Sequence, residues 1–594
     1  MGSERGARAG LALAALLAVS APLAAAEETG DPGGVRMRRP GATSDAASPY
    51  QRRFHLDGES LDFEVAPPAK AFPSLVPMPD RWRIVEGLGV NERWWNPYDQ
   101  STLKGDRPIF GQDWFFVLGA VSDTLVEPRR LPTPVGAQAT EHPGELDVFG
   151  NGDQLFFNQN FIVSLALIQG DTTFRPPDWE FRVTTVTSLN FLGVNERGVV
   201  SPNPDKGTTR FDQHAGIQEL FVDRHLRNKS QAYDFDSLRL GIQPFITDFR
   251  GFLYFDGQPG ARLFGNFWSN RLQYNLAAFC RLEKDTNSGL NTVFDMRDDQ
   301  VFAADFFYQD WLTKGFTLEG LVVYNRNREG DENPHYDENG FLKRPSPVGD
   351  QRPSSYDVVY LGTGGDGHVG RLNLTTNLFL ATGSDSHNPI AQRSVGILAW
   401  LGALEASMDF DWIRAKAYAY HASGDGDPYD GTATGFDAIF ENPNFAGAGT
   451  SFWVRQGLPF VGGGGVGLKD RFSILPDLRS SKLEGQSNFV NPGITLAGVG
   501  ADFDVLPELR IVSNANWIGF DKTETLQTLR QQRAVAQDVG WDLSAGVIYR
   551  PLFIDNLVFQ VSGAVLVPAQ GLKDIYAHDY GVFYSTVFNA ILTY

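Results

Sequence analysis

The chain has 594 residues, and its formal net charge of −20 at pH 7 disfavours nucleic acid as a partner, because phosphates repel carboxylates. It holds a single cysteine, Cys280, so no disulfide within the chain can stabilise it. The chain contains 63 glycines, 44 phenylalanines and 12 tryptophans, and its stability must come from interactions other than disulfides. A closed ladder of backbone hydrogen bonds would supply that stability.

Residues 1–26 have the pattern of a secretory signal peptide. Arg5 and Arg8 precede an apolar run, and three alanines before Glu27 form an A-x-A-like cleavage site. No later stretch offers the roughly 18 consecutive apolar residues of a spanning helix. The mature chain is therefore expected to be exported, and then to stay soluble or to enter a membrane as strands.

Residues 27–111 are rich in proline, glycine and arginine and show little periodicity. We interpret them as a periplasmic N-terminal segment that is partly disordered. Trp82, Trp94, Trp95 and Tyr98 are too apolar for a free tail. Residues 81–110 are expected to dock at the periplasmic mouth of the following domain and narrow it as a plug, while 27–67 stays mobile.

From residue 112 onward, runs of about 10–15 residues alternate apolar and polar side chains, as strands with two different faces do. Eighteen such runs are expected, and an even number is typical of bacterial outer-membrane barrels. The runs are 114–127, 157–169, 179–193, 213–226, 236–249, 260–267, 271–283, 298–312, 315–328, 354–362, 367–382, 395–408, 412–423, 493–505, 508–520, 539–550, 555–568 and 581–594.

The expected connections alternate between short and long. Short ones are 551–554, 506–507, 409–411, 364–366, 313–314 and 268–270; long ones are 569–580, 521–538, 424–492, 383–394, 329–353 and 284–297. Outer-membrane barrels have short periplasmic turns and long extracellular loops. A soluble β-sandwich, the alternative for any single strand, has no reason to alternate in this way.

The last run, 584–594, alternates apolar and polar residues and ends on Tyr594, which resembles substrates of the outer-membrane assembly machinery. Aromatic residues also fall at predicted strand ends, as in interfacial girdles: Trp114, Trp179, Trp268, Trp311, Trp412, Trp517 and Trp541. The sequence thus predicts an all-β protein, an antiparallel transmembrane barrel of about 18 strands (16–18) over residues 112–594. Its expected place is the outer membrane of a Gram-negative bacterium, in contact with membrane lipids and lipopolysaccharide.

Strand parity predicts which side chains face the lumen. Leu272, Leu276 and Leu282 should face lipid, which turns the alternate residues inward. The lumen and selectivity candidates are Arg182, Arg239, Gln243, Arg271, Asn275, Arg281, Arg371, Asn373, Arg414, Lys416, Arg510 and Arg550. Most are basic, and cationic rings favour anions. The alternative is that these arginines pair with carboxylates and hold the wall together.

The longest loop, 424–492, is too long to be a simple connection. We expect part of it to fold inward and constrict the lumen; an external cap is the alternative. Asp425, Asp427 and Asp430 at its start could supply oxygen ligands to Ca²⁺, although aspartates are also common in turns. No other cofactor is expected.

Two patches resemble the alginate-export family of outer-membrane barrels. The first is Ser423-Gly424-Asp425 followed by Asp430-Gly431, Thr434, Phe436-Asp437 and Phe440; the second is 238–243 with Asp248, Arg250-Gly251 and 260–263. Ile242 stands where that family usually has arginine. The resemblance implies an 18-stranded channel for a polysaccharide, but it maps none of the arginines that would select one.

Catalysis is not expected, because the sequence has no zinc-binding spacing of histidines, no nucleophile elbow and no P-loop. His421 and Ser423, which share one strand face, are the only weak candidate for a catalytic Ser–His pair. The chain is therefore predicted to be a porin for diffusion of polar or anionic solutes or oligosaccharides. The alternative is a scaffold or sheath around a partner, such as an electron-conduit cytochrome or a surface structure, with the N-terminal segment binding a periplasmic protein.

Overall fold

The computed structural model describes residues 89, 93–96, 98–99, 101–111, 113–135, 151–170, 176–230, 234–551, 556–576 and 581–594. The chain divides into two units, Met1–Arg39 and Pro40–Tyr594, and every described residue belongs to the second. The expected signal peptide and most of the segment 27–111, Trp82 included, lie outside the described residues.

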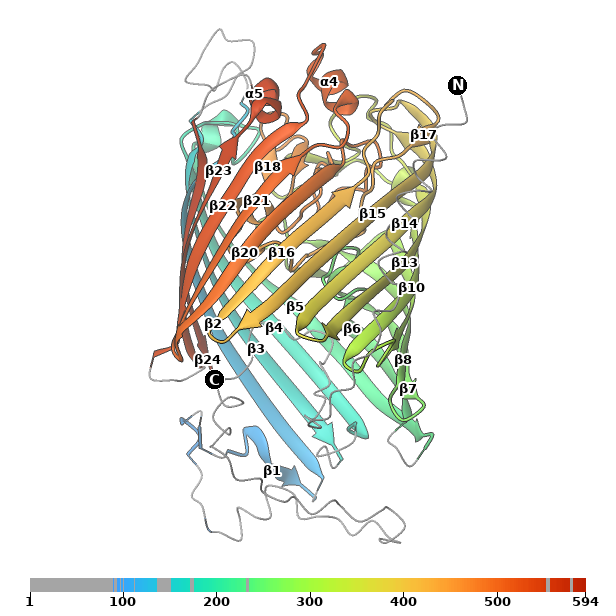
Figure 1. Cartoon of the computed structure of the whole chain (residues 1–594), viewed down its shortest axis with the longest axis vertical. Helices are drawn as coiled ribbons and strands as arrows, with labels where there is room; N and C mark the ends of the chain where they lie inside the picture. Colours follow the sequence, from blue (N-terminus) through green and yellow to red (C-terminus); the bar gives the residue numbers. More distant parts are fainter. Residues whose placement is uncertain are drawn as a thin grey trace. The chain divides into compact units, whose positions relative to one another are not determined.

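Eighteen strands of the described chain form a closed antiparallel barrel (Figure 1). The barrel closes where β2 (Trp114–Arg130) pairs with β24 (Phe583–Thr593), with Val121 opposite Thr593. The other barrel strands are β3 (Asp153–Gln169), β4 (Trp179–Val194), β5 (Thr209–Asn228), β6 (Phe235–Ile246), β7 (Phe255–Phe267), β8 (Leu272–Lys284), β9 (Asn291–Tyr308), β10 (Phe316–Asn327), β13 (Tyr356–Val369), β14 (Leu372–Asn388), β15 (Arg393–Phe410), β16 (Ile413–Ala422), β20 (Ile494–Leu506), β21 (Leu509–Gly519), β22 (Asp538–Tyr549) and β23 (Leu557–Pro568). The predicted number of strands is confirmed.

The outer face of the wall is apolar, and the inner face is buried by what the barrel contains. On β8, Leu276 is 42% exposed, whereas Asn275 and Ala277 on either side of it are each 8% exposed. On β3, Phe161 and Leu165 are exposed and Ala166 is buried. An exposed apolar belt on a closed barrel fits a surface that contacts lipid. No helix among the described residues is long and apolar enough to cross a membrane.

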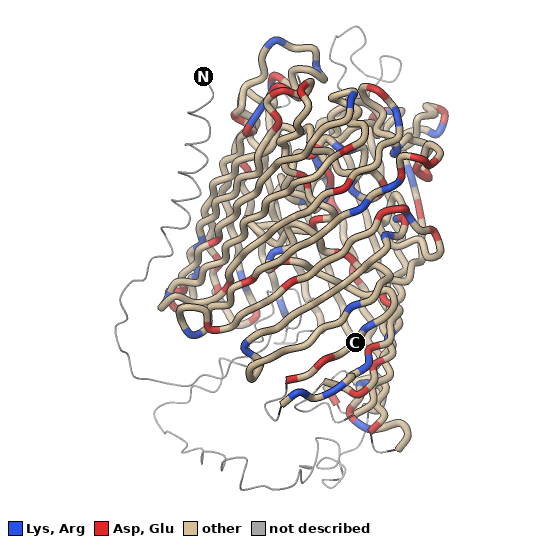
Figure 2. The backbone as a smooth tube through the Cα atoms, turned by 90° about the vertical axis from the view of Figure 1, so that its right-hand side faces the viewer, with Lys and Arg blue, Asp and Glu red and all other residues tan. Residues whose placement is uncertain are grey.

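The two rims differ, as expected (Figures 1 and 2). At the rim with short turns, here called the turn rim, Trp268, Trp311 and Trp412 are exposed in the connections. At the opposite rim, here called the loop rim, Trp541 is exposed near the start of β22. Aromatic side chains therefore lie at both rims, where the interfaces of a membrane would be.

The N-terminal segment extends the wall. Strand β1 (Lys104–Phe110) pairs with the first residues of β2, which run past the end of β24 toward the turn rim. Phe110 packs on Trp114, with 5.2 Å between ring centroids. The described part of 81–110 thus covers an open edge of β2 beside the barrel. Trp94 and Trp95 are 63% and 64% exposed, in contrast to the burial expected of a docked plug.

Short elements occupy the connections. They are η3 (Pro204–Lys206), η4 (Glu329–Asp331), β11 (His335–Tyr336) paired with β12 (Leu342–Arg344), β17 (Thr432–Ala433), α3 (Phe452–Arg455), β18 (Leu458–Pro459) paired with β19 (Gly467–Lys469), α4 (Glu524–Arg530) and α5 (Gln570–Tyr576).

Three expected connections are wrong, and one of them, the expected long connection 284–297, is the short connection 285–290, because β9 already begins at Asn291. Residues 364–366 lie inside β13, because their glycines make room for neighbours instead of forming a turn: a Cβ on Gly365 would lie 2.4 Å from Cζ of Phe316. The actual turn is at Gly370 and Arg371. The expected long loop 383–394 is a short turn at 389–392, because β14 and β15 both extend beyond their predicted ends.

Candidate functional site

The long loop between β16 and β20, residues 424–492, folds into the barrel, and we call it the plug. Its backbone runs inside the ring of strands (Figure 1), and its aromatic side chains pack on rings from well-separated strands. Phe436 lies 6.1 Å from Tyr360 of β13, and Phe452 lies 6.3 Å from Phe583 of β24, measured between ring centroids. The expected constriction is therefore present, and the external cap is not what the structure shows.

Polar contacts fix the plug to the rest of the wall. Asp542 of β22 accepts hydrogen bonds from the backbone N–H groups of Phe452 and Trp453. On the other side of the barrel, the guanidinium of Arg297 in β9 donates to the carbonyl oxygen of Leu483 at 3.1 Å. The plug is thus held by strands all around the lumen.

The strongest anchor is Glu127 of β2, whose side chain is fully buried. It accepts hydrogen bonds from Gln456 at 2.6 Å and from Arg471 at 3.1 Å, both in the plug. Arg129 and Ser585, from the wall, complete its surroundings. One carboxylate therefore joins two plug residues to the seam where the barrel closes.

A second loop, 247–254 between β6 and β7, also turns inward. Asp248 shapes it by accepting the backbone N–H groups of Arg250, Gly251, Phe252 and Leu253. Its backbone pairs with the plug, because the N–H of Ile439 donates to the carbonyl of Leu253 at 3.1 Å. Arg250 reaches the far wall, where its guanidinium lies 3.0 Å from Glu405 of β15.

On the turn-rim side of these loops, charged side chains line the wall in pairs. Lys416 of β16 lies 2.6 Å from Asp502 of β20, and Arg510 of β21 lies 3.7 Å from the same carboxylate. Across the barrel, Arg239 of β6 donates to Asp223 of β5 at 2.7 Å. The basic side chains of the lumen are therefore paired, largely with neighbouring wall strands.

Carboxylates dominate one arc of the lumen. Asp305 of β9 and Glu319 of β10 are 1% and 0% exposed, and Glu405 of β15 lies further round. Arg250 and Arg262 are the basic groups that face them. This arc of the inner wall is therefore acidic, in contrast to the basic candidate residues elsewhere in the lumen.

Nine of the twelve lumen candidates lie on barrel strands with the expected inward parity: Arg182, Arg239, Gln243, Asn275, Arg281, Asn373, Arg414, Lys416 and Arg510. Arg281 pairs with Asp299 at 2.7 Å and Arg182 with Glu180 at 2.6 Å. The other three, Arg271, Arg371 and Arg550, lie in the connections of the turn rim. Their expected strand position is wrong because the strands begin or end one residue away from them.

Sequence reasoning missed Glu127 and Glu405, and it named Arg250 only as part of a patch of family resemblance. Each gains its partner from a segment far away in the chain, so no local spacing marks it. Asp248 was named only because its patch resembles a known family. The Asp-x-Arg-Gly pattern could also have predicted a carboxylate that accepts the backbone N–H groups of its own turn.

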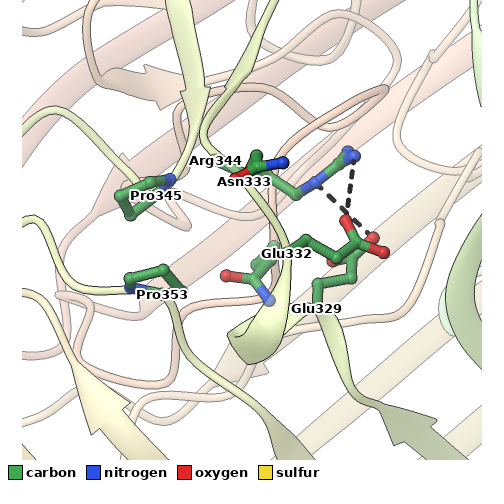
Figure 3. A pocket seen from close by; sticks show the side chains of 7 residues that line it. Glu329, Glu332, Asn333, Arg344, Pro345 and Pro353 are labelled. Carbon is green, nitrogen blue, oxygen red and sulfur yellow. Dashed lines mark ion pairs between the residues drawn. The ribbon is translucent and has the colours of Figure 1, made fainter.

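The loop rim carries a buried network of ion pairs (Figure 3). Arg297 lies 2.7 Å from Glu329, and Arg344 lies 3.6 Å from the same carboxylate, beside a narrow crevice that Gln486 of the plug also lines. Burial alone would raise the pKa of Glu329, but Arg297 and Arg344 outweigh it and lower that pKa to about 2. This carboxylate is therefore charged at neutral pH.

The aspartates at the start of the plug behave as turn residues. Asp425 accepts the N–H of Asp427 at 3.0 Å, and Asp430 accepts the N–H of Thr432 at 2.7 Å. Burial, with Asp430 and Asp427 nearby, raises the pKa of Asp425 to about 6. In the part of the chain that the structure describes, the ligand atoms that converge closely enough for a metal belong to three other residues.

His421 and Ser423 do not form a catalytic pair. Nδ1 of His421 lies 2.8 Å from the hydroxyl of Thr495, and its ring contacts Trp400 in a tilted arrangement, with 4.6 Å between ring centroids. The hydroxyl of Ser423 donates to the carbonyl of Thr434 at 2.7 Å. Both groups therefore serve the junction between the wall and the plug.

No family model and no curated protein match this chain. Among solved structures, it is similar to OccK7 (OpdD) of Pseudomonas aeruginosa, with 10% identity and a TM-score of 0.45, over 81% of this chain and 98% of that one. It is also similar to OccK9 (OpdG) of the same organism, with 12% identity and a TM-score of 0.44, over 80% and 98%. A third is the P. aeruginosa OpdK structure with vanillate, with 14% identity and a TM-score of 0.40, over 80% and 98%.

Proposed function

We propose that this chain is an outer-membrane channel for the diffusion of small polar solutes. The observation that carries the proposal is the combination of a closed, externally apolar barrel with a charged lumen narrowed by two inward loops. A barrel of 16–18 strands leaves an aqueous channel unless loops fill part of it. Here the plug and loop 247–254 would set the size of what passes.

The pairing of charges in the lumen argues for polar solutes over a preference for anions. Lys416 with Asp502 and Arg239 with Asp223 each present a positive and a negative group side by side. Such pairs can hydrogen-bond a sugar hydroxyl, a zwitterion or either ion in turn. In these pairs a neighbouring carboxylate offsets the positive charge on which the anion preference expected from the arginines would depend.

The two patches that resemble the alginate-export family have a structural use here. Ser423 and Asp425 form hydrogen bonds at the start of the plug, in the part here called its neck, where residues near Gly424 and Gly493 lie side by side. Asp248 shapes the other inward loop. We propose that any kinship with that family concerns how loops are fixed inside a barrel. Transport of an oligosaccharide remains part of the proposal and does not rest on any mapped arginine.

A sheath around a folded partner is less favoured. The plug packs against strands on all sides, so a multihaem protein would have to displace its buried rings. A periplasmic partner could still bind the exposed Trp94 and Trp95 near the turn rim. We further propose contacts with membrane lipids and lipopolysaccharide, and assembly by the barrel machinery through the strand that ends at Tyr594.

A liposome-swelling assay tests the proposed function. The refolded protein should admit small neutral sugars and zwitterionic amino acids, and the rate should fall as solute size increases. Barrels heat-unfolded before reconstitution are the control. Swelling no faster than in that control, for every solute tried, would contradict a diffusion channel.

A further inference from the structure

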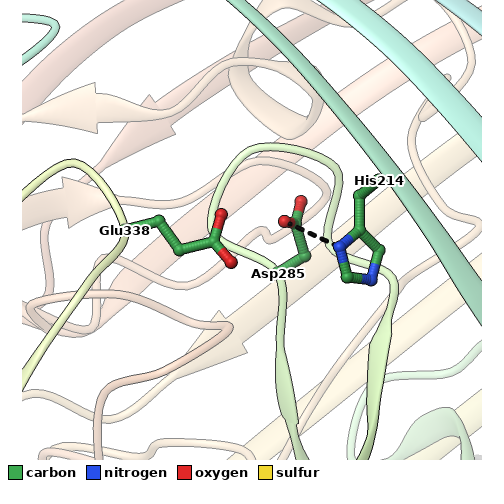
Figure 4. Close-up of side chains that lie close together, drawn as sticks. All are labelled: His214, Asp285 and Glu338. Carbon is green, nitrogen blue, oxygen red and sulfur yellow. Dashed lines mark ion pairs between the residues drawn. The ribbon is translucent and has the colours of Figure 1, made fainter.

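His214, Asp285 and Glu338 bring one ligand atom each to within 4.8 Å of one another near the loop rim (Figure 4). His214 lies on β5, Asp285 in the connection between β8 and β9, and Glu338 in the connection between β11 and β12. Nδ1 of His214 lies 3.2 Å from the carboxylate of Asp285. Two ligands bound at about 2 Å to one tetrahedral zinc ion have a similar separation.

The two connections that supply the carboxylates are fixed to each other. The backbone N–H of Glu338 donates to the hydroxyl of Thr286 at 3.2 Å, and the amides of Asn287 and Asn339 pair at 2.9 Å. Asp285 is held in its own turn by the N–H of Ser288 at 2.7 Å. Backbone and amide hydrogen bonds therefore hold the two carboxylate connections together, in addition to the contacts among the three ligand groups themselves.

The site has more negative than positive charge around it. The carboxyl groups of Asp285 and Glu338 are in hydrogen-bonding contact, which requires a proton or a cation between them. Asp212 and Glu484 add negative charge near Glu338. Among the described residues, Arg210 is the permanent cation that acts on Asp285, and it also acts on Asp212 and Asp337.

Polar atoms around the site are buried and have no hydrogen-bond partner in the described structure: one carboxylate oxygen each of Asp212 and Glu484, and Nε2 of His214. Nδ1 of His214 faces Asp285 and is the nitrogen that would bind an ion, whereas Nε2 lies on the opposite side of the ring (Figure 4). The side chain of Glu484, in the plug, is 3% exposed, and its other carboxylate oxygen accepts a hydrogen bond from the hydroxyl of Thr286 at 3.1 Å. Buried polar atoms without partners usually mark a missing water or ion.

We infer that His214, Asp285 and Glu338 form a site for a divalent first-row transition-metal ion, of which Zn²⁺ is the example. One imidazole and two carboxylates are ligands that zinc accepts, and a hard ion such as Ca²⁺ would take oxygen ligands alone. Bound there, the ion would join strand β5 to the two connections at the loop rim.

The test uses the full chain, refolded in detergent and treated with EDTA. Calorimetric titration with Zn²⁺ and the visible absorption of added Co²⁺ should report one saturable site. His214→Gln and Glu338→Gln should each weaken Zn²⁺ binding at least about tenfold, which is about 1.4 kcal/mol. Glu338 is exposed, so its substitution leaves the fold intact, and a heat-modifiability gel verifies this for each variant.

Asp350→Asn is the matched control, because Asp350 and His387 form another His–Asp pair at 3.4 Å, for which the described residues supply no third ligand. It should leave the titration unchanged. The inference fails if the wild-type protein shows no saturable Zn²⁺ or Co²⁺ site. It fails equally if folded His214→Gln and Glu338→Gln proteins bind like the wild type, or if Ca²⁺ alone binds. Solute diffusion can persist in each case, so the outcome is separate from that of the proposed function.

Discussion

Charge pairs on the lumenal wall set the local charge that an ion in the lumen encounters. Lys416 and Arg510 share the carboxylate of Asp502, so each group is partly neutralised by its neighbours. Their side chains are 18%, 19% and 8% exposed, which leaves them within reach of lumenal water. Removing one member should therefore change the sign of the charge that the wall presents.

We predict that Asp502→Asn shifts the ion selectivity of the channel toward anions, and that Lys416→Gln shifts it toward cations. The reversal potential in a salt gradient across a planar bilayer measures both shifts. Arg371→Gln, at the turn rim and exposed, should have a smaller effect. Equal reversal potentials in all three variants would contradict the prediction, because they would show that ions do not pass close to Asp502 and Lys416.

The carboxylate of Glu127 has a different role from those of the lumenal pairs, because it is buried and contacts the plug. Glu127→Gln leaves the nearby Arg129, Arg455 and Arg471 without their carboxylate, and breaking a buried ion pair in this way costs about 3–5 kcal/mol. The plug should then detach more often, seen as noisier and larger current steps.

Asp153→Asn is the control for Glu127. Asp153 on β3 pairs with Arg130 on β2. About a third of each side chain is exposed, so the pair contributes roughly 0–1 kcal/mol to stability. Its current steps should match those of the wild type. If both variants behave alike, Glu127 does not anchor the plug.

At the scale of elements, the neck of the plug is the part most sensitive to substitution. Gly424 and Gly493 lie against each other there, and a Cβ on Gly424 would lie 2.1 Å from the carbonyl oxygen of Pro492. Backbone atoms cannot move aside as a flexible side chain can. Any larger residue at 424 must spread the neck apart.

Gly424→Ala should therefore loosen the plug, whereas Gly449→Ala, inside the plug with nothing within 4 Å of its Cβ, should not. Limited proteolysis of the folded protein measures the difference: cleavage within residues 424–492 should be faster in the first variant. Identical digestion of the two proteins would show that the neck has room to adjust.

The strands could be predicted because one face contacts lipid and must be apolar, which leaves a period of two in the sequence. Leu276 and its neighbours on β8 are an example. The glycine cluster 364–366 misled the prediction, since glycine makes room for a neighbouring ring as well as forming turns. The partners of Glu127 and the convergence of His214 with Asp285 and Glu338 depend on the folded plug and loops, which no local pattern records.

At the scale of the whole molecule, the barrel and its contents are separable. Every barrel strand bonds to two others, so the wall does not need the plug to close. Ala422 and Ile494, on either side of the plug, are paired directly across β16 and β20. A tight Asn-Gly turn could therefore replace the whole plug without moving either strand.

The unitary conductance of single channels in planar bilayers, compared between the wild type and this plug-deleted barrel, tests the central claim most directly. The account predicts discrete steps for the wild type and steps several-fold larger once the plug is removed, because the lumen of an 18-stranded barrel is then open. Heat-modifiability gels verify that both proteins are folded. A folded, plug-deleted barrel that conducts no current, or no more than the wild type, would contradict it.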